Sequence, residues 1–154
     1  MCVYGIEMDG MTIVRRVVVV SVGLTWNVVA RALGRVGLGE GDVVLLFNSV
    51  PRVAEAEQAM ERLERWIKET YGGSILVESY WLDPRLGFEE AVATIRRSVE
   101  KYAPCRVSFV IAGGFRWLGL AVAFAAFAAY TLSQFPAVVV ESLEPELVED
   151  IRAG

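Results

Sequence analysis

Residues 17–36 read VVVVSVGLTWNVVARALGRV and contain the pattern that decides the fold. Val17 to Val22 is a run of mostly β-branched apolar residues, which is typical of a strand buried on both faces of a parallel sheet. The run ends at Gly23, and Trp26 to Val36 then carries apolar residues at helical spacing. Gly37 follows in the position of a C-terminal cap. The stretch therefore predicts a strand followed by a crossover helix.

The same alternation continues along the chain. We expect further strands at 42–47, 75–80, 106–112 and 137–140. We expect a helix that opens at Pro51 and runs to about Tyr71, and two more at 88–102 and 117–132. Buried strands joined by helices through short connections indicate parallel pairing and right-handed crossovers. The prediction is an α/β fold with a Rossmann-like, doubly wound, mainly parallel sheet of strand order 3-2-1-4-5.

The length of 154 residues is close to the commonest size of one domain. We expect residues 11–154 to form a single Rossmann domain and residues 1–10 to be an N-terminal extension of unknown structure. Within the acidic tail, residues 141–151 fit either a short helix or a strand-like arm, and the pattern leaves both open.

Composition excludes several kinds of chemistry. The chain has no histidine, which removes the usual general base and the commonest metal ligand. Only Cys2 and Cys105 are present, far apart, so we expect no metal site, no cofactor and a cytoplasmic protein with reduced thiols. The net charge of −4 argues against binding duplex DNA through its phosphates. An excess of arginine over lysine is a mild indication of a thermophilic source.

The stretch 117–132 is apolar throughout, so it could be a membrane span or a core helix. It is shorter than the roughly 20 residues that a span needs, and it is rich in alanine. A helix that is apolar on all sides is usually buried on two sides. We therefore expect no membrane segment and a helix that is covered on both faces.

Ligands of open α/β sheets bind at the carboxyl ends of the strands, where the strand order reverses. In the predicted order this point lies between the first and fourth strands. The expected site comprises the two loops that follow these strands, together with the residues that end the second strand. The candidate ligand-binding residues are Gly23, Leu24, Thr25, Trp26, Asn27, Asn48, Ser49, Gly113, Gly114, Phe115 and Arg116.

The second of these loops carries the best anion signal. Paired glycines let the backbone approach a ligand closely, the following helix offers free N–H groups, and Arg116 adds a planar cation suited to phosphate. The alternative is that the glycines only turn the chain and Arg116 is a surface charge. Neither a G-x-G-x-x-G nor a Walker A motif is present, which makes NAD or nucleoside triphosphate binding a minor option.

The remaining candidates have equally ordinary alternatives. Thr25 or Asn27 could cap the first helix instead of meeting a phosphate. Trp26 could pack under that helix instead of stacking on a base. Asn48 and Ser49 could contact a base edge, but turn chemistry explains them as well.

Two runs carry a resemblance to a known family. VVVVSVGLTWNVVARALGRVGLGEGDVVLLF and, above all, VSFVIAGGFRWLGLAVAFAA resemble the CRISPR-associated Rossmann-fold (CARF) domain, closest to that of the archaeal CRISPR-associated transcription regulators. The resemblance covers roughly Arg16 to Val140. It implies a homodimer whose two crevices form one pocket for a cyclic oligoadenylate, most often the ring of four. We expect the winged helix of those regulators to be missing, which makes direct transcription control doubtful.

Three functions remain in view. The first is a sensor that binds cyclic tetra-adenylate as a homodimer. The second is a metal-independent ring nuclease, in which Arg116 and Thr25 would assist attack by the ligand's own 2′-hydroxyl. The third is a generic nucleotide-binding module, because a fold by itself does not fix a function.

Overall fold

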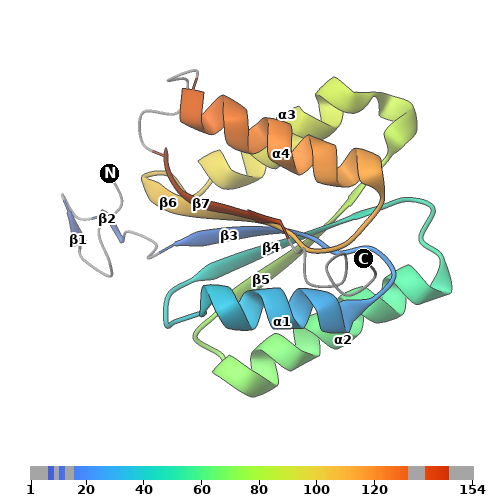
Figure 1. Cartoon of the computed structure of the whole chain (residues 1–154). Coiled ribbons are helices and arrows are strands. Elements are labelled where there is room, and N and C mark those ends of the chain that lie inside the picture. The colour runs from blue at the N-terminus through green and yellow to red at the C-terminus, as the bar shows by residue number, and fades with distance from the viewer. Residues whose placement is uncertain (1–6, 9–10, 13–15, 132–137, 146–154) are drawn as a thin grey trace.

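Five parallel strands form the main sheet of the protein in the computed structural model, which describes residues 7–8, 11–12, 16–131 and 138–145 (Figure 1). The strands pair in the order β5-β4-β3-β6-β7, which is the predicted order 3-2-1-4-5. Their bounds are β3 (Val17–Ser21), β4 (Val43–Ser49), β5 (Leu76–Leu82), β6 (Cys105–Ile111) and β7 (Val138–Pro145). The α/β fold class and the doubly wound order are therefore confirmed.

The helices cover both faces of this sheet. The helices are α1 (Trp26–Val36), α2 (Ala54–Tyr71), the short 3-10 helix η1 (Pro84–Leu86), α3 (Phe88–Glu100) and α4 (Arg116–Thr131). Figure 1 shows α1 and α2 on one side of the sheet and α3 and α4 on the other. The chain thus changes faces between α2 and α3, as a doubly wound fold requires.

Strand β3 lies at the centre of the core and is buried over its whole length. Val17 and Val19 pack with α3 and α4, whereas Val18 and Val20 pack with α1 and α2. Full burial of a valine contributes about 1.5–3 kcal/mol, so this run anchors both layers. The prediction of a strand buried on both faces is correct.

The amino-terminal edge of the sheet is closed by a buried ion pair. Arg16 donates through Nη2 to Oδ2 of Asp42 at 3.0 Å and also to the carbonyl of Gly37. The same carboxylate oxygen accepts from the N–H of Gly39 at 2.9 Å. These charges are therefore used in tying strands and loops together at the edge opposite to the predicted site.

Two helix expectations need correction. The second helix begins at Ala54 and not at Pro51. The N–H of Val50 donates to the carbonyl of Leu82, and the N–H of Val53 donates to the carbonyl of Pro51. These two hydrogen bonds hold the segment before Ala54 as a turn. The third ends at Glu100, two residues earlier than expected. Both differences lie at element ends, where local turn bonds compete with helical ones.

The apolar helix also differs from expectation. One face of α4 is buried against the sheet, but the opposite face exposes Leu120, Phe124 and Phe127 by 55, 56 and 61%. The expectation of a helix covered on both sides is therefore wrong for the single chain, because the sheet supplies only one covering layer. No helix in the described part of the chain is long and apolar enough to cross a membrane.

The two ends of the chain are described only in part. Within and next to the expected N-terminal extension, β1 (Glu7–Met8) pairs antiparallel with β2 (Met11–Thr12). The last strand is described from Val138 to Pro145, so the first part of the acidic tail is strand, while the expected first residue, 137, lies outside the described residues. Residues 146–151 lie outside the described residues.

Candidate functional site

The carboxyl ends of β3 and β6 lie side by side, and the two predicted loops start from them. Ser21 pairs with Ile111 at the ends of the two strands. On the other side of β3 the sheet continues through β4 to β5. The strand order therefore reverses between β3 and β6, and the switch point is where the sequence places it.

The two loops touch through their backbones. The N–H of Gly113 donates to the carbonyl of Ser21 at 3.2 Å. A Cβ atom on Gly113 would lie 2.0 Å from the carbonyl oxygen of Val22, and a Cβ atom on Gly23 would lie 2.3 Å from the nitrogen of Gly114. Gly23 and Gly114 also have φ angles of +91° and +98°. Side chains at Gly23 and Gly113 would therefore force the loops apart, so these glycines have a packing role whatever they bind.

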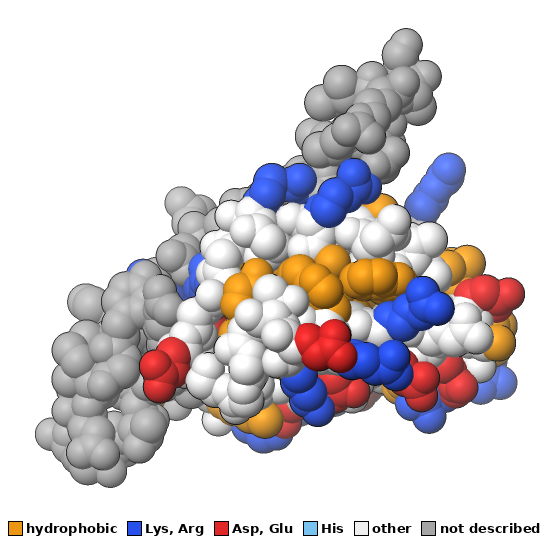
Figure 2. Space-filling model, turned by 90° about the horizontal axis from the view of Figure 1, so that it is seen from below, with side chains coloured by type: hydrophobic (Ala, Val, Ile, Leu, Met, Phe, Trp, Pro, Cys, Tyr) orange, Lys and Arg blue, Asp and Glu red, His pale blue; other side chains and the backbone are white. Residues whose placement is uncertain are grey.

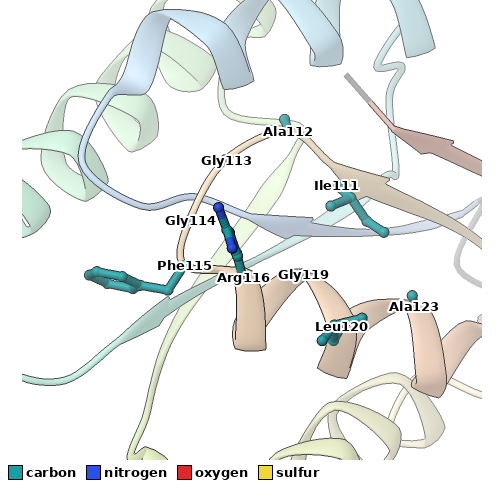
Figure 3. Close-up of a pocket in the computed structure, with 9 residues that line it drawn as sticks. All are labelled: Ile111, Ala112, Gly113, Gly114, Phe115, Arg116, Gly119, Leu120 and Ala123. Carbon is teal, nitrogen blue, oxygen red and sulfur yellow. The ribbon is translucent and has the colours of Figure 1, made fainter. Parts of the chain in front are cut away.

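A pocket of about 510 Å³ opens beside the second loop (Figure 3). It is lined by Ile111, Ala112, Gly113, Gly114, Phe115, Arg116, Gly119, Leu120 and Ala123. Its wall is apolar except for backbone groups and Arg116. The pocket thus combines a surface that suits a flat apolar group with one permanent positive charge.

The first turn of α4 adds a second source of positive potential. The carbonyl of Phe115 accepts from the N–H groups of Leu118 and Gly119, at 3.0 and 3.1 Å. The N–H groups of Arg116 and Trp117 precede the first such bond, so they have no acceptor within the helix. Free N–H groups and the helix dipole favour an anion at this position.

Arg116 and Phe115 point in different directions in Figure 3. Arg116 projects from the start of α4 back toward the glycine loop, whereas Phe115 points away from the other lining side chains. Both side chains are exposed. No ion pair of Arg116 is found among the described residues.

The first loop has a mixed character. Thr25 occupies the N-cap position of α1 but its side chain makes no capping hydrogen bond, and it is exposed together with Leu24 and Asn27. Trp26 is half-buried and packs against the core on the α1 and α2 side. Trp26 thus contributes to packing, whether or not its exposed part meets a ligand, and the hydroxyl of Thr25 makes no cap.

Asn48 and Ser49 lie beneath this loop and not on the surface. The amide of Asn48 donates to the carbonyl of Gly23 at 2.8 Å and accepts from the N–H of Ser49 at 2.8 Å. The hydroxyl of Ser49 donates to the carbonyl of Val50 at 2.8 Å. Both side chains are buried, and this arrangement fits the turn interpretation. The contribution of Asn48 to a site would be to hold Gly23 in place.

Sequence reasoning did not single out Leu120 and Ala123, which line the pocket. They lie four and seven residues after Arg116, so helical spacing alone puts all three on one face of α4. It also passed over Ser21, a polar residue in an otherwise apolar run. Its hydroxyl is fully buried at the switch point and has no hydrogen-bond partner in the described structure.

The described residues contain no group of three or more Cys, Asp or Glu side chains that could hold a metal ion. Comparison with known proteins gives one finding. A family model described as the Csa3 CRISPR-associated Rossmann-like domain matches residues 16–147. No curated protein matches the chain.

Proposed function

Because the chain belongs to the family of the Csa3 CRISPR-associated Rossmann-like domain, we propose that it is a sensor domain that binds cyclic tetra-adenylate as a homodimer. The observation that carries this proposal is the junction of the two glycine loops at the switch point, with Arg116 and the start of α4 beside an apolar pocket. A nucleotide has groups that complement this site, because it carries an anionic phosphate and a flat base.

The phosphate would lie against Arg116 and the first N–H groups of α4. A bidentate guanidinium and oriented backbone donors both favour an oxygen anion, and neither requires a metal. The neighbouring wall from Ile111 to Ala123 would then cover apolar parts of the ligand. The binding of a nucleotide-derived ligand follows from this pairing of chemistries.

The exposed face of α4 supports the homodimer. Leu120, Phe124 and Phe127 form this face, and Phe88 of α3 extends it through an edge-to-face contact with Phe124 at 5.3 Å. Burying the exposed part of each side chain would contribute roughly 1 kcal/mol or more. Leu120 also lines the pocket, so a second copy on this face would help to enclose the ligand. Two-fold symmetry suits a ring that presents the same groups to both copies.

The surface charge supports a small ligand over a duplex. Figure 2 shows the face formed by α1 and α2, where acidic and basic side chains lie together over the lower part and several basic side chains lie along the upper part. The net charge of −4 disfavours the broad positive field that binding of a DNA backbone requires.

A ring nuclease is the second candidate, and the hydroxyl of Thr25, which is exposed and makes no capping hydrogen bond, favours it. RNA supplies its own nucleophile in the 2′-hydroxyl, so a protein can assist cleavage by holding it in line and stabilising the charged phosphorane. Arg116 would stabilise that charge and Thr25 would orient the phosphate. In the absence of histidine to transfer protons, we expect any turnover to be slow.

One calorimetric experiment tests these proposals. The purified chain is titrated with cyclic tetra-adenylate and with linear tetra-adenylate in the presence of a chelator, and the products are then separated. Preferential binding of the intact ring supports the sensor, and a linear product supports the nuclease. Equal affinity for both forms would leave only a generic nucleotide-binding module.

A further inference from the structure

Strand β5 forms one edge of the main sheet, and its outer side has no partner strand among the described residues. The N–H of Leu76 donates to the carbonyl of Asp42 at 3.2 Å, so the even-numbered residues of β5 turn their backbone groups toward β4. Backbone groups alternate in direction along a strand. The N–H and C=O groups that face outward are therefore those of Val77, Ser79 and Trp81.

This edge lacks the features that usually protect an edge strand, which are shortness, bulges, proline and free lysine. Strand β5 has seven residues and pairs with β4 without a register shift, whereas the pairing of β6 with β7 contains one. Its sequence, LVESYWL, has no proline, glycine or lysine. Its one charged residue, Glu78, accepts from Nζ of Lys101 at 2.8 Å and from the hydroxyl of Tyr80 at 3.1 Å. The strand is therefore regular and open to pairing.

The side chains along β5 leave room for a second strand. Ser79, in the middle, is exposed, and Leu76 is 51% exposed. Val77 and Trp81 pack against the core on the α1 and α2 side but are only partly buried. Another strand can therefore reach the outward backbone groups without displacing a side chain from the core.

The outward residues complement those of a second copy of the same strand. Ser79 is the middle residue of β5, so antiparallel pairing about a two-fold axis at Ser79 uses the whole strand. Val77 then lies opposite Trp81, and a β-branched residue opposite an aromatic one is a favourable cross-strand pair. Glu78 lies opposite Tyr80, so no like charges face each other. An axis at Glu78 would instead set two carboxylates opposite each other, which is unfavourable.

We propose that the edge of β5 pairs with β5 of a second copy of the chain, antiparallel and about a two-fold axis at Ser79. Each outward residue exchanges both backbone hydrogen bonds with the residue opposite, as in strand addition. Stable interfaces bury roughly 1,200–2,000 Å², and one strand edge offers less. The contact is therefore weak and forms at protein concentrations well above micromolar.

This contact is separate from the proposed dimer through α4. Helix α4 packs over β6 and β7, toward the other edge of the sheet. One copy can therefore use both surfaces at once, and dimers that form through α4 would be linked edge to edge into larger assemblies. The strand pairing needs no ligand, so its failure would leave the proposed function untouched.

Disulfide cross-linking tests the register. In the proposed pairing Ser79→Cys lies opposite itself, with Cα atoms about 5.5 Å apart, a distance that suits a disulfide. Val77→Cys lies on the same edge, but its two copies are separated along the pair by four residues, from 77 to 81, which is about 13 Å and too far to link. Arg62→Cys, exposed on α2, is the control for random collision.

Each variant also carries Cys2→Ser and Phe124→Glu, which remove the Cys2 thiol and disrupt the proposed α4 contact, while Cys105 is buried. With an added oxidant at sub-millimolar protein, Ser79→Cys should link at least about tenfold faster than the two controls, because paired thiols have a high effective concentration. Equal rates for Ser79→Cys and Val77→Cys would overturn the two-fold register. A rate no higher than that of Arg62→Cys would overturn the pairing.

Light scattering gives a second readout that uses no disulfide. In the Phe124→Glu background, Ser79→Lys sets two ammonium groups opposite each other, which opposes pairing. Phe124→Glu alone should approach the mass of a dimer at sub-millimolar concentration, and the double variant should stay monomeric. Tm should not fall, because Ser79 is exposed and its N–H faces outward. Equal masses for the two proteins would overturn the proposal.

Discussion

Gly23→Ala should weaken the fold at the junction of the two loops. The backbone at Gly23 has φ +91°, a conformation that costs an L-residue about 1–2 kcal/mol. The new Cβ atom would lie 2.3 Å from the nitrogen of Gly114, which is backbone and has no rotamer with which to move away. The loops must therefore separate, and we expect a total loss of about 2–4 kcal/mol.

Gly37→Ala is the matched control. Gly37 also has a positive φ, +74°, but a Cβ atom there would meet nothing within 4 Å. This variant therefore pays only the conformational cost of about 1–2 kcal/mol. The difference between the two variants isolates the contact between the loops.

The assay is thermal unfolding followed by ligand titration. For a chain of this length a loss of 1 kcal/mol lowers Tm by about 2–4 °C, so Gly23→Ala should melt roughly 5–15 °C below wild type. The decrease in Tm for Gly37→Ala should be about half of that or less. Gly37→Ala should bind cyclic tetra-adenylate normally at a temperature where it is folded, and Gly23→Ala should not. Equal destabilisation of the two variants would refute the argument that the loops are locked by contact.

Three further predictions follow from the site and its surroundings. Arg116→Ala should reduce the affinity for cyclic tetra-adenylate by tenfold to over a hundredfold, about 1.5–3 kcal/mol, and leave Tm unchanged. The control Arg62→Ala, on α2, should change neither the affinity nor Tm. If calorimetry finds wild-type affinity in Arg116→Ala, the ligand binds elsewhere. Phe124→Glu should convert a dimer into a monomer in light scattering, and a wild-type chain that is already monomeric at micromolar concentration would contradict the proposed interface. The side-chain hydrogen bond from Arg85 lowers the pKa of Asp83, so its contribution to stability is present near neutral pH and is lost as the pH falls through that lowered pKa. In an NMR titration of the Asp83 carboxyl carbon, Arg85→Ala should move the midpoint to higher pH. An unmoved midpoint would count against the hydrogen bond from Arg85 as the cause of the lowered pKa.

The strands at the centre of the sheet could be predicted because β3 and β4 are apolar runs long enough to show their type. The run from Val17 to Val22 has no polar face, which indicates a strand buried on both sides. The short connections then restrict the topology to a few strand orders. The start of the second helix could not be predicted, because Pro51 suits both a first helical turn and the loop that it occupies. The choice depends on bonds with β5, which lies far along the chain.

The sequence predicts only those features of the site that depend on the order of the strands. The loops that carry Gly23 and Gly114 come together because parallel strands end at one edge of the sheet, which is a property of the strand order alone. The burial of Asn48 beneath Gly23 depends on the path of a backbone carbonyl, and no residue type reveals that path.

The contact between Gly23 and Gly114 also bears on how the chain folds. The first three strands of the main sheet can pair as they leave the ribosome, but β3 is a central strand and lacks its second neighbour until β6 is made. Until then β3 presents an unpaired edge of valines, which is a template for aggregation. Closing so long a loop is slow, so we expect the junction of Gly23 and Gly114 to form late, together with α4. A ligand that holds the junction closed would oppose its reopening and slow unfolding, although it takes no part in the early steps of folding.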